Sequence, residues 1–352
     1  MQQVFREAIL KNYARQCPFV VYASPGSLEL SGIFQRNNRR HEYKPGARGF
    51  IFAPFSSELK TLFLPLEQCD MLTTGTEKSE MEEDFDEIKL NSRQKEFHIR
   101  LVEQAIDHIN SSELEKVVVS RKQNVSFTNF DLLELLLQLF TKNVNAFRYA
   151  WFHPKSGLWV GATPEVLLTV SNNQYKTMSL AGTRSANLKE QYDWTAKEYH
   201  EQQVVTDAIA HDLESFSETI DISEVRSSRA GSLEHLRTDI EGELRSGYSW
   251  WDLATTLHPT PAVCGSPKEE ALDFVLKKEG YNREYYTGFF GPTAILEGQT
   301  DLYVNLRCMR IRDNIATIYA GGGITRDSDP TAEWEETCNK QQTMLKLLSQ
   351  FL

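Results

Sequence analysis

Apolar and polar residues alternate over many short runs of this chain, as in strands, and longer amphipathic stretches typical of helices lie between them. Residues 1–90 give the weaker signals: an opening helix, short candidate strands at 19–24 and 49–55, and an acidic stretch at 76–90. Such a charge run is usually a solvated linker or helix face, so we assign it no function.

The pattern is clearer from Arg93 onward. A helical stretch leads into the strand-like run LEKVVVSRKQNVSF, and a second helix follows at 131–140. The next segment, FRYAWFHPKSGLWVGATPEVLLTVSNNQYKTMSLAGTR, has short β-rich runs separated by turn pairs at 156–157 and 172–173. This spacing predicts an antiparallel meander.

The second half of the chain continues the alternation of helices and strands. We expect, in order, a long helix at about 189–215, a polar loop at 217–232, a strand at 232–244, a helix at 249–257, strands at 303–311 and 315–324, and a helix from Pro330 to the C-terminus. The helix over SWWDLATTL stops at His258-Pro259, because the residue before a proline avoids helical conformation.

Meanders interrupted by helices imply an α+β fold in which large antiparallel β-sheets pack together with helices on the outside. We see no linker that divides the chain. We therefore expect a single domain over 1–352, with the main core in 93–352 and an N-terminal part in 1–92.

The composition limits the partners. The chain has 38 basic and 49 acidic residues and a net charge of -11, which argues against nucleic acid and anionic membranes as partners. The five cysteines are widely separated and lack metal-ligand spacing, so we expect a reduced, cytoplasmic chain. The N-terminal stretch lacks the apolar core of a signal peptide, and no run approaches a membrane span, so we expect neither export nor insertion.

The C-terminal helix carries the sharpest cluster of candidate chemistry. Glu333, Glu336 and Lys340 are three and four residues apart, so they share one helical face, where a solvated Glu–Lys pair is the ordinary alternative. The chain reaches this helix through GGGITRDSDP (321–330), whose glycines allow backbone amides to approach a ligand closely. This loop lacks the spacing of a P-loop or a dinucleotide fingerprint, which disfavours nucleotide binding.

Carboxylates without Cys or His neighbours suit a hard, oxygen-preferring cation such as Mg²⁺. Glu201, in KEYHEQQVV, is a candidate third ligand from the earlier helix. Taken alone, a glutamate in such a helix is more often a surface residue.

Further candidates lie in and beside the predicted strands. Lys116 opens the VVVS strand and Glu165 lies in GATPEVLL; the ordinary alternatives are an edge-protecting lysine and a carboxylate paired with an arginine. As a pair, a desolvated lysine with a lowered pKa and a glutamate with a raised pKa suit a general base and a general acid. Arg307, expected within a strand, and Tyr286 suit a carboxylate receptor unless Arg307 forms a structural salt bridge. His258 is more typical of a loop hydrogen bond than of a catalyst.

Taken in order, these segments resemble the chorismate-binding family, which includes isochorismate, salicylate, anthranilate and aminodeoxychorismate synthases. The resemblance covers about 115–345. The matching segments are EKVVVSR, GATPEVLL, LAGTR, the helix that contains Glu201, LHPTPAVCG, REYYTG, YVNLRC and YAGGGITRDSDPTAEWEET.

The resemblance implies roles for these residues. Lys116 matches the base that activates water for attack at C2 of chorismate, and Glu165 matches the acid that protonates the departing C4 hydroxyl. Magnesium is the implied cofactor, with Glu201 and Glu336 as ligands and Glu333 close by. The positions that match the surroundings of the enolpyruvyl carboxylate, the metal and the ring are Gly182, Thr183, Ala262, Val263, Tyr286, Arg307, Gly321 and Lys340.

A few positions separate members of such a family. Ala181 stands where aminodeoxychorismate synthases carry a lysine nucleophile, and Lys116 argues against anthranilate synthases with their glutamine amidotransferase partner. LHPTPAVCG resembles isochorismate synthases more than salicylate synthases, which share Lys116 and the Gly-Thr pair. Two departures are Gln202, where a histidine is frequent, and the short region before Arg93.

We therefore expect an isochorismate synthase, a magnesium-dependent isomerase that acts on the small molecule chorismate as a monomer or weak homodimer. No amidotransferase subunit, nucleic acid or membrane is expected as a partner. The alternatives are a salicylate synthase, which would go on to release pyruvate, and a non-catalytic chorismate-binding subunit. The product would feed menaquinone or siderophore biosynthesis.

Overall fold

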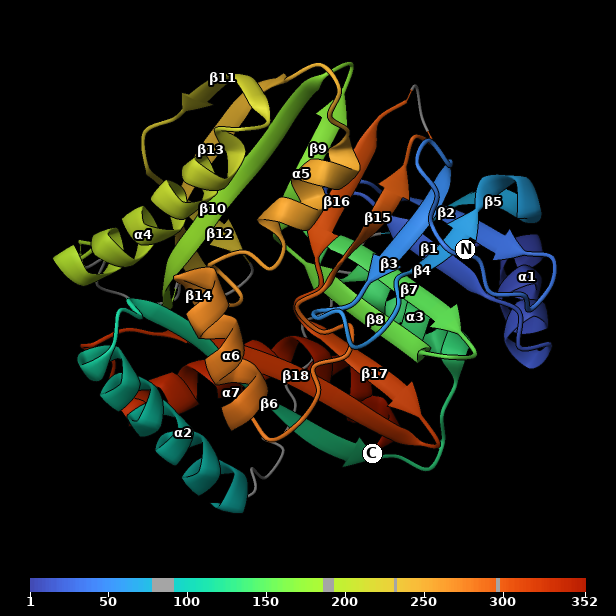
Figure 1. The fold of residues 1–352 in the computed structure, drawn as a ribbon. Coiled ribbons are helices and arrows are strands. Elements are labelled where there is room, and N and C mark those ends of the chain that lie inside the picture. Colours follow the sequence, from blue (N-terminus) through green and yellow to red (C-terminus); the bar gives the residue numbers. More distant parts are fainter. Residues whose placement is uncertain (78–91, 186–192, 231–232, 296–297) are drawn as a thin grey trace.

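The structure, a computed structural model, describes residues 1–77, 92–185, 193–230, 233–295 and 298–352. Its strands pair in an antiparallel manner and form two large sheets with helices on the outside (Figure 1). The α+β class and the packing of antiparallel sheets predicted from the sequence are confirmed.

The first sheet contains the strand that begins at Lys116. Within the described residues its strand order is β14 (Gly265–Ser266), β6 (Lys116–Ser126), β18 (Ile315–Ile324), β17 (Cys308–Arg312), β8 (Gly157–Thr163), β7 (Phe147–His153), β1 (Phe19–Ala23), β2 (Glu29–Gln35) and β5 (Cys69–Gly75).

The second sheet contains the long strands of the middle of the chain. Its order within the described residues is β11 (Ser217–Ile222), β13 (Leu233–Leu244), β10 (Gln174–Ser185), β9 (Val166–Ser171), β16 (Thr300–Val304), β15 (Phe289–Thr293), β3 (Gly49–Ala53) and β4 (Leu62–Pro65), with β12 (Arg226–Ala230) also paired with β13.

An aromatic core joins the inner faces of the two sheets. Phe52 on β3 stacks on Trp151 on β7 with ring centroids 4.9 Å apart, and Tyr149 contacts Phe290 on β15 at 4.2 Å. All four side chains are fully buried. Because rings of this size remove a large apolar area from water, this contact fixes how the sheets lie on each other.

Helices cover the outer faces (Figure 1). Against the first sheet pack α1 (Gln3–Ala14), α2 (Ser92–Ser111), α3 (Leu132–Thr141), α6 (Lys268–Lys278) and α7 (Pro330–Leu348), and α4 (Ala196–Leu213) and α5 (Trp250–Leu257) pack against the second. Two short 3₁₀ helices occupy Leu66–Gln68 and Ser349–Phe351. The apolar faces of α4 and α5 meet the outer face of the second sheet in one hydrophobic cluster.

Two of the local predictions for residues 147–232 are wrong. The polar stretch 217–232, expected as a loop, contains the strands β11 and β12. Its polarity reflects solvent exposure, since most residues of β11 are exposed while its backbone still pairs with β13. The expected meander is also interrupted, because β8 and β9 belong to different sheets. The acidic stretch at 76–90 lies almost entirely outside the described residues.

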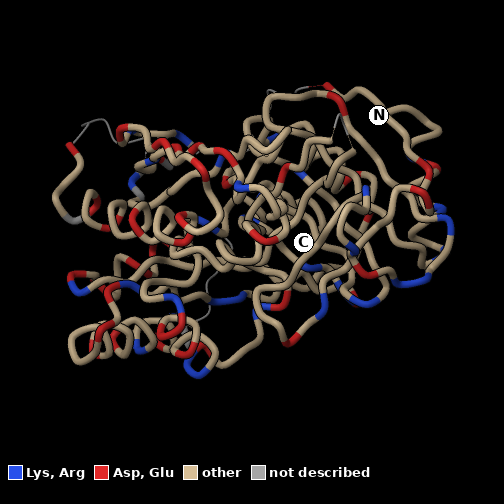
Figure 2. Tube along the Cα trace, turned by 45° about the horizontal axis from the view of Figure 1, so that its top comes forward, with Lys and Arg blue, Asp and Glu red and all other residues tan. Residues whose placement is uncertain are grey.

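Charged residues of both signs are mixed along the chain. Figure 2 shows Lys and Arg positions interspersed with Asp and Glu positions along the described trace. Within the described residues, none of the helices combines the length and the apolar content that crossing a membrane requires.

Candidate functional site

Two of the places where the chain crosses between the two sheets are neighbours, and each of these two carries a predicted site residue. Glu165 lies between β8 and β9, and Arg307 lies between β16 and β17. The crossings are tied together, since the Thr163 hydroxyl donates to the Val304 carbonyl at 2.7 Å and the Val304 amide donates to the Glu165 carbonyl at 3.1 Å. The backbone of each crossing is therefore anchored in both sheets, and this fixes the positions of the Glu165 and Arg307 side chains.

The strand predicted at 303–311 is accordingly two strands in different sheets. Arg307, expected within a strand, is in the crossing and has a φ of 45°, a conformation uncommon for residues other than glycine. Its backbone carbonyl accepts a hydrogen bond from the Ala162 amide at 3.1 Å. The left-handed turn interrupts the ladder, and the sequence pattern gave no sign of it.

Lys116 begins β6 and is buried. Its ammonium lies 2.9 Å from the Glu201 carboxylate, and the Lys116 side chain is 3% exposed. The edge-lysine alternative is wrong, because β14 pairs with β6 at this end, with Ser266 opposite Lys116, and β18 pairs along its other side. Within the described residues no arginine forms an ion pair with Glu165 either, so its ordinary alternative is not observed.

The last helix presents its acidic face to the same region. The helix begins at Pro330, and the Asp329 side chain caps it by accepting from the Ala332 amide at 2.8 Å. One turn later Glu336 forms an ion pair with Lys340, and the Lys340 ammonium donates to the Gly321 carbonyl at 2.9 Å. The expected helical face is thus present, and part of it is the i,i+4 pair of the ordinary alternative.

The glycines at 321–323 make room for side chains of the site, a role additional to the close approach of backbone to a ligand that the sequence predicts. They lie within β18, and the space where a Cβ would stand is taken by side chains of the site. A Cβ at Gly322 would meet Glu333 Oε2 at 2.8 Å, and a Cβ at Gly323 would meet Lys116 Cε at 2.8 Å. Side chains from α7 and β6 can approach the strand only because these residues lack a side chain.

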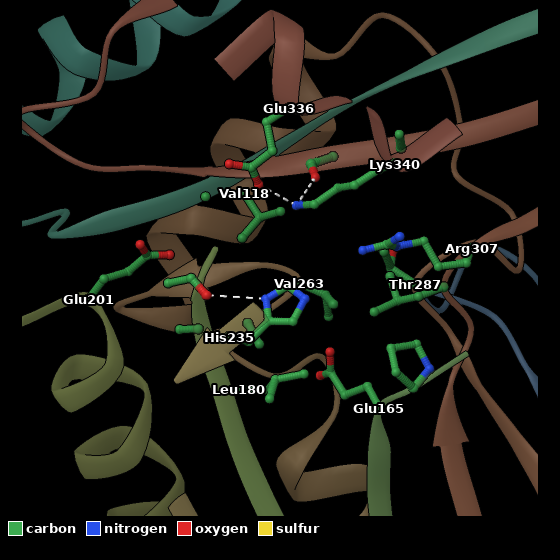
Figure 3. Close-up of a pocket in the computed structure, with 18 of the residues that line it drawn as sticks. Val118, Glu165, Leu180, Glu201, His235, Val263, Thr287, Arg307, Glu336 and Lys340 are labelled. Carbon is green, nitrogen blue, oxygen red and sulfur yellow. Dashed lines mark hydrogen bonds and ion pairs between the residues drawn. The ribbon is translucent and has the colours of Figure 1, made fainter. Parts of the chain in front are cut away.

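One pocket gathers almost all of the predicted residues (Figure 3). Its lining includes Lys116, Glu165, Gly182, Glu201, Ala262, Val263, Tyr286, Arg307, Gly321, Glu333, Glu336 and Lys340. Thr183 is the exception, since its backbone is in β10 but its side chain lies outside the described residues. Figure 3 shows Glu165 pointing into the cavity opposite Glu336 and Lys340.

Burial makes Glu165 an acid that titrates near neutral pH. Desolvation raises its pKa to about 7, although the nearby charges of Lys116 and Lys340 act in the opposite direction. A carboxyl group with such a pKa carries its proton in a large fraction of molecules at neutral pH, which is the state that a general acid requires.

Burial keeps the histidine of the pocket neutral. Burial and the charges of Arg307 and Lys340 lower the pKa of His235 to about 3, and its Nδ1 lies 3.1 Å from the Gly182 carbonyl. Since that carbonyl can only accept, Nδ1 carries the proton. Burial also raises the pKa of Tyr286, so its hydroxyl stays protonated and can donate to an anion.

Comparison with known proteins places this geometry in a family. A family described as "Chorismate binding enzyme" matches residues 55–349. The chain belongs to the chorismate-binding enzyme family. The match begins well before residue 115, where the resemblance in the sequence began, and so takes in part of the N-terminal region.

Individual members of the chorismate-binding family agree with the same assignment. The chain is 32% identical over 265 residues to the isochorismate synthase DhbC of Bacillus subtilis, covering 70% of this chain and 66% of the relative. It is 31% identical over 245 residues to the isochorismate synthase EntC of Escherichia coli K12, covering 67% and 62%. The matches thus span less than two thirds of these relatives' own lengths.

The overall fold matches a solved member of the family. A Bacillus anthracis protein described as a 2,3-dihydroxybenzoate-specific isochorismate synthase superimposes with a TM-score of 0.79 at 26% identity, covering 97% of this chain and 99% of that one.

Gln202, the departure from the family pattern, has a structural explanation. Its buried amide accepts from the Ala181 amide at 2.8 Å and donates to the Ser179 hydroxyl at 2.7 Å and the Thr238 hydroxyl at 3.1 Å. These bonds fix α4 to β10 and β13 beside Glu201. A glutamine therefore supplies the donors and the acceptor that this contact needs.

Among the described residues of the pocket, sequence reasoning did not single out three that are ionisable, Glu198, His235 and Tyr319. Glu198 lies one helical turn before Glu201, the same three-residue spacing as Glu333 and Glu336, so helical spacing could have found it. His235 is a single histidine in a strand, which carries no such signal. It enters the pocket because β13 pairs with β10 at the register shift beside Gly182.

The candidate metal ligands lie around one pocket without closing on a common point. In the part of the chain that the structure describes, no three His, Cys, Asp or Glu side chains are grouped closely enough to hold a metal ion. Glu201 and Glu336 instead have Lys116 and Lys340 as partners, and Glu333 accepts from the Ser328 hydroxyl at 2.9 Å. The donor type, all carboxylate oxygen, fits a hard cation.

Proposed function

We propose that this chain converts chorismate to isochorismate. The observation that carries the proposal is that a buried lysine, Lys116, and a carboxyl group with a pKa of about 7, Glu165, line the same pocket. A base and an acid are the two groups needed to add water at one carbon of the ring and expel a hydroxyl from another. The related isochorismate synthases support the same reaction.

In this mechanism the neutral amine form of Lys116 accepts a proton from the water molecule that attacks C2. The double bonds of the ring shift, and Glu165 donates its proton to the C4 hydroxyl, which leaves as water. One water is gained and one is lost, so substrate and product are isomers. Each group is expected to contribute roughly 10²–10⁴-fold to the rate.

Cationic and hydroxyl groups at one end of the pocket would bind the substrate carboxylates. The Arg307 guanidinium can hold a carboxylate through two parallel hydrogen bonds, and the protonated hydroxyl of Tyr286 can add a third. Figure 3 shows Arg307 and Lys340 on the same side of the cavity. These groups would orient the ring between Lys116 and Glu165.

The charges of the pocket favour a metal ion with the substrate. Among the described residues its lining has five glutamates and three basic residues, namely Glu165, Glu198, Glu201, Glu333, Glu336, Lys116, Arg307 and Lys340. When Glu165 is protonated and Lys116 is the neutral base that the mechanism requires, four carboxylates face two cations, so a dianion would bring the total from about -2 to about -4. Negative charges that share one pocket repel one another strongly when the local dielectric constant is low.

Magnesium would reduce this repulsion. Glu201, Glu333 and Glu336 are the residues that would hold the ion, which would supply charge neutralisation and a fixed point for the ring carboxylate. Calorimetric titration of the protein with Mg²⁺ tests this proposal. We expect binding that weakens in Glu336→Gln, and an unchanged titration in that variant would contradict the ligand assignment.

The location, the oligomeric state and the exact product of the protein belong to the same proposal. The predicted cytoplasmic location and the monomer or weak homodimer stay as predictions, and sedimentation analysis would test the latter. A salicylate synthase would release pyruvate as well, so product analysis separates the two functions. A non-catalytic subunit would bind chorismate without turnover.

The base is tested with a matched pair of variants on one strand. Lys116→Ala should lower turnover by roughly 10²–10⁴-fold, whereas Lys122→Ala, at an exposed position of β6, should leave it near wild type. Isochorismate is measured by chromatography, and circular dichroism checks the fold. Near-normal turnover in Lys116→Ala would contradict the assignment of Lys116 as the base.

A further inference from the structure

A buried ion pair lies directly behind the pocket. Glu279 and Arg283 follow the end of α6, and their side chains are 0% and 1% exposed. Arg283 Nε donates to Glu279 at 2.8 Å, and Nη2 makes a second bond to the same carboxylate. Burial alone would lower the pKa of Arg283, but the charge of Glu279 more than offsets it. Arg283 therefore stays charged.

The remaining donors of Arg283 go to three separate parts of the pocket wall. Nη1 donates to the Val263 carbonyl at 2.8 Å and to the Thr287 hydroxyl at 3.2 Å. Nη2 donates to the Val118 carbonyl at 2.7 Å. All three of these residues line the pocket, whereas Arg283 itself does not. One rigid guanidinium thus sets the spacing of three wall segments.

Glu279 extends the same arrangement along β6. Its carboxylate accepts from the Ser120 amide at 2.7 Å and from the Ser120 hydroxyl at 3.0 Å. Ser120 stands opposite Gly321 in the β6–β18 ladder, and the Gly321 carbonyl in turn accepts from Lys340. The pair consequently contacts the strands on which the cationic part of the pocket rests.

The backbone conformation of Thr287 requires support from neighbouring groups. It is β-branched and has a φ of 58°, a conformation that costs free energy and persists only when its surroundings enforce it. The Thr287 amide donates to the Asn305 carbonyl at 2.9 Å, and Arg283 holds the hydroxyl. Tyr286, which precedes it, presents its hydroxyl to the pocket from this same turn.

We propose that Glu279 and Arg283 are positioning residues that hold the Val118, Val263 and Tyr286-Thr287 segments in the arrangement the substrate requires, a role that rests on the function proposed above. A buried ion pair is weak evidence for stability, since well-packed apolar residues often replace one at no loss. The pair makes three hydrogen bonds to backbone, at Val263, Val118 and Ser120, that apolar residues could not reproduce.

The test compares two buried arginines. Arg283→Lys keeps a charge beside Glu279, but one ammonium cannot reach three wall segments at once. Arg148→Lys is the matched control, because Arg148 is 0% exposed and also donates to backbone carbonyls, those of Phe140 and Ser27, away from the pocket lining. We expect kcat/KM of Arg283→Lys to fall on the order of 10²-fold, and that of Arg148→Lys to stay within about twofold when normalised to folded protein.

Amide hydrogen exchange gives a second readout that needs no substrate. In Arg283→Lys, protection should fall at Val263 and Thr287, whose amides donate to the Thr260 and Asn305 carbonyls, and it should not fall there in Arg148→Lys. If Arg283→Lys does not fold, Thr287→Val keeps the ion pair and the side-chain shape but removes one acceptor. We expect that variant to lose up to about tenfold in kcat/KM, and no loss would overturn the proposal.

The two proposals fail in different ways. If wild type is active and Arg283→Lys equals Arg148→Lys in kcat/KM and in local protection, the positioning role is wrong and the proposed function stands. If wild type makes no isochorismate, the proposed function is wrong. The exchange experiment then decides the positioning role, with unchanged protection at Val263 and Thr287 overturning it.

Discussion

Replacing Glu165 by glutamine should make the protein more stable at neutral pH and far less active. The folded structure raises the pKa of Glu165 from 4.5 to about 7, because burial disfavours the ionised carboxylate. At about 1.4 kcal/mol per pKa unit, this rise corresponds to about 3 kcal/mol. Glutamine has the same shape and never ionises, so it escapes that cost.

The direction of the pH dependence of stability follows from proton binding. Since the folded state binds the proton of Glu165 more tightly than the unfolded state, protonation stabilises the fold fully below pH 4.5, and this contribution is lost as the pH rises through about 7. Relative to wild type, the unfolding free energy of Glu165→Gln should therefore increase by about 3 kcal/mol between acidic and mildly alkaline pH.

Urea unfolding at a series of pH values, combined with chromatography of isochorismate, measures both effects. Turnover of Glu165→Gln should fall by roughly 10²–10⁴-fold, and wild-type turnover should decline as the pH rises above about 7. Glu241→Gln is the control, because that side chain is 51% exposed and paired with Lys176 at the surface. A Glu165→Gln variant that is active, or that is less stable than wild type at alkaline pH, would refute the reasoning.

Three further changes test other parts of the pocket and the packing beside it. Arg307→Lys keeps the charge but loses the planar fork, so KM for chorismate should rise roughly 10–100-fold, measured by initial rates; an unchanged KM would remove Arg307 from the carboxylate site. Gly323→Ala would place a methyl group 2.9 Å from Glu201 Oε1 and should lower kcat/KM on the order of 10²-fold. Gly75→Ala is the control, because no atom lies within 4 Å of its Cβ, and it should leave kcat/KM unchanged. Equal effects of the two variants would contradict the packing argument. Gln202→Leu leaves a buried amide without its acceptor and should lower the unfolding free energy by about 1–3 kcal/mol in urea, and a variant as stable as wild type would show that this contact does not anchor α4.

Local patterns predicted the elements best where one strand stays in one sheet. The strand at 315–324 has the predicted bounds, because alternation and the turn before it are both encoded locally. The run 303–311 predicts one continuous strand because most of its residues are apolar or aromatic. The crossing at Arg307 depends on contacts with distant segments, such as the Ala162 amide, which no window of sequence contains.

The residues of the site likewise divide into those that local sequence predicts and those that depend on distant contacts. Helical spacing identified Glu333, Glu336 and Lys340, and the same rule would have added Glu198. The buried state of Lys116 could not be derived locally, since it depends on β14 pairing with β6 from about 150 residues away. The raised pKa of Glu165 likewise depends on the packing of both sheets around the crossing.

The most direct test of the account is incubation of the pure protein with chorismate and Mg²⁺, with EDTA controls, followed by chromatography of the products and fluorescence detection of salicylate. The account predicts isochorismate that forms only when the metal is present, without salicylate or pyruvate. Chorismate that remains unchanged would contradict the proposed function, and salicylate with an equal amount of pyruvate would make the chain a salicylate synthase.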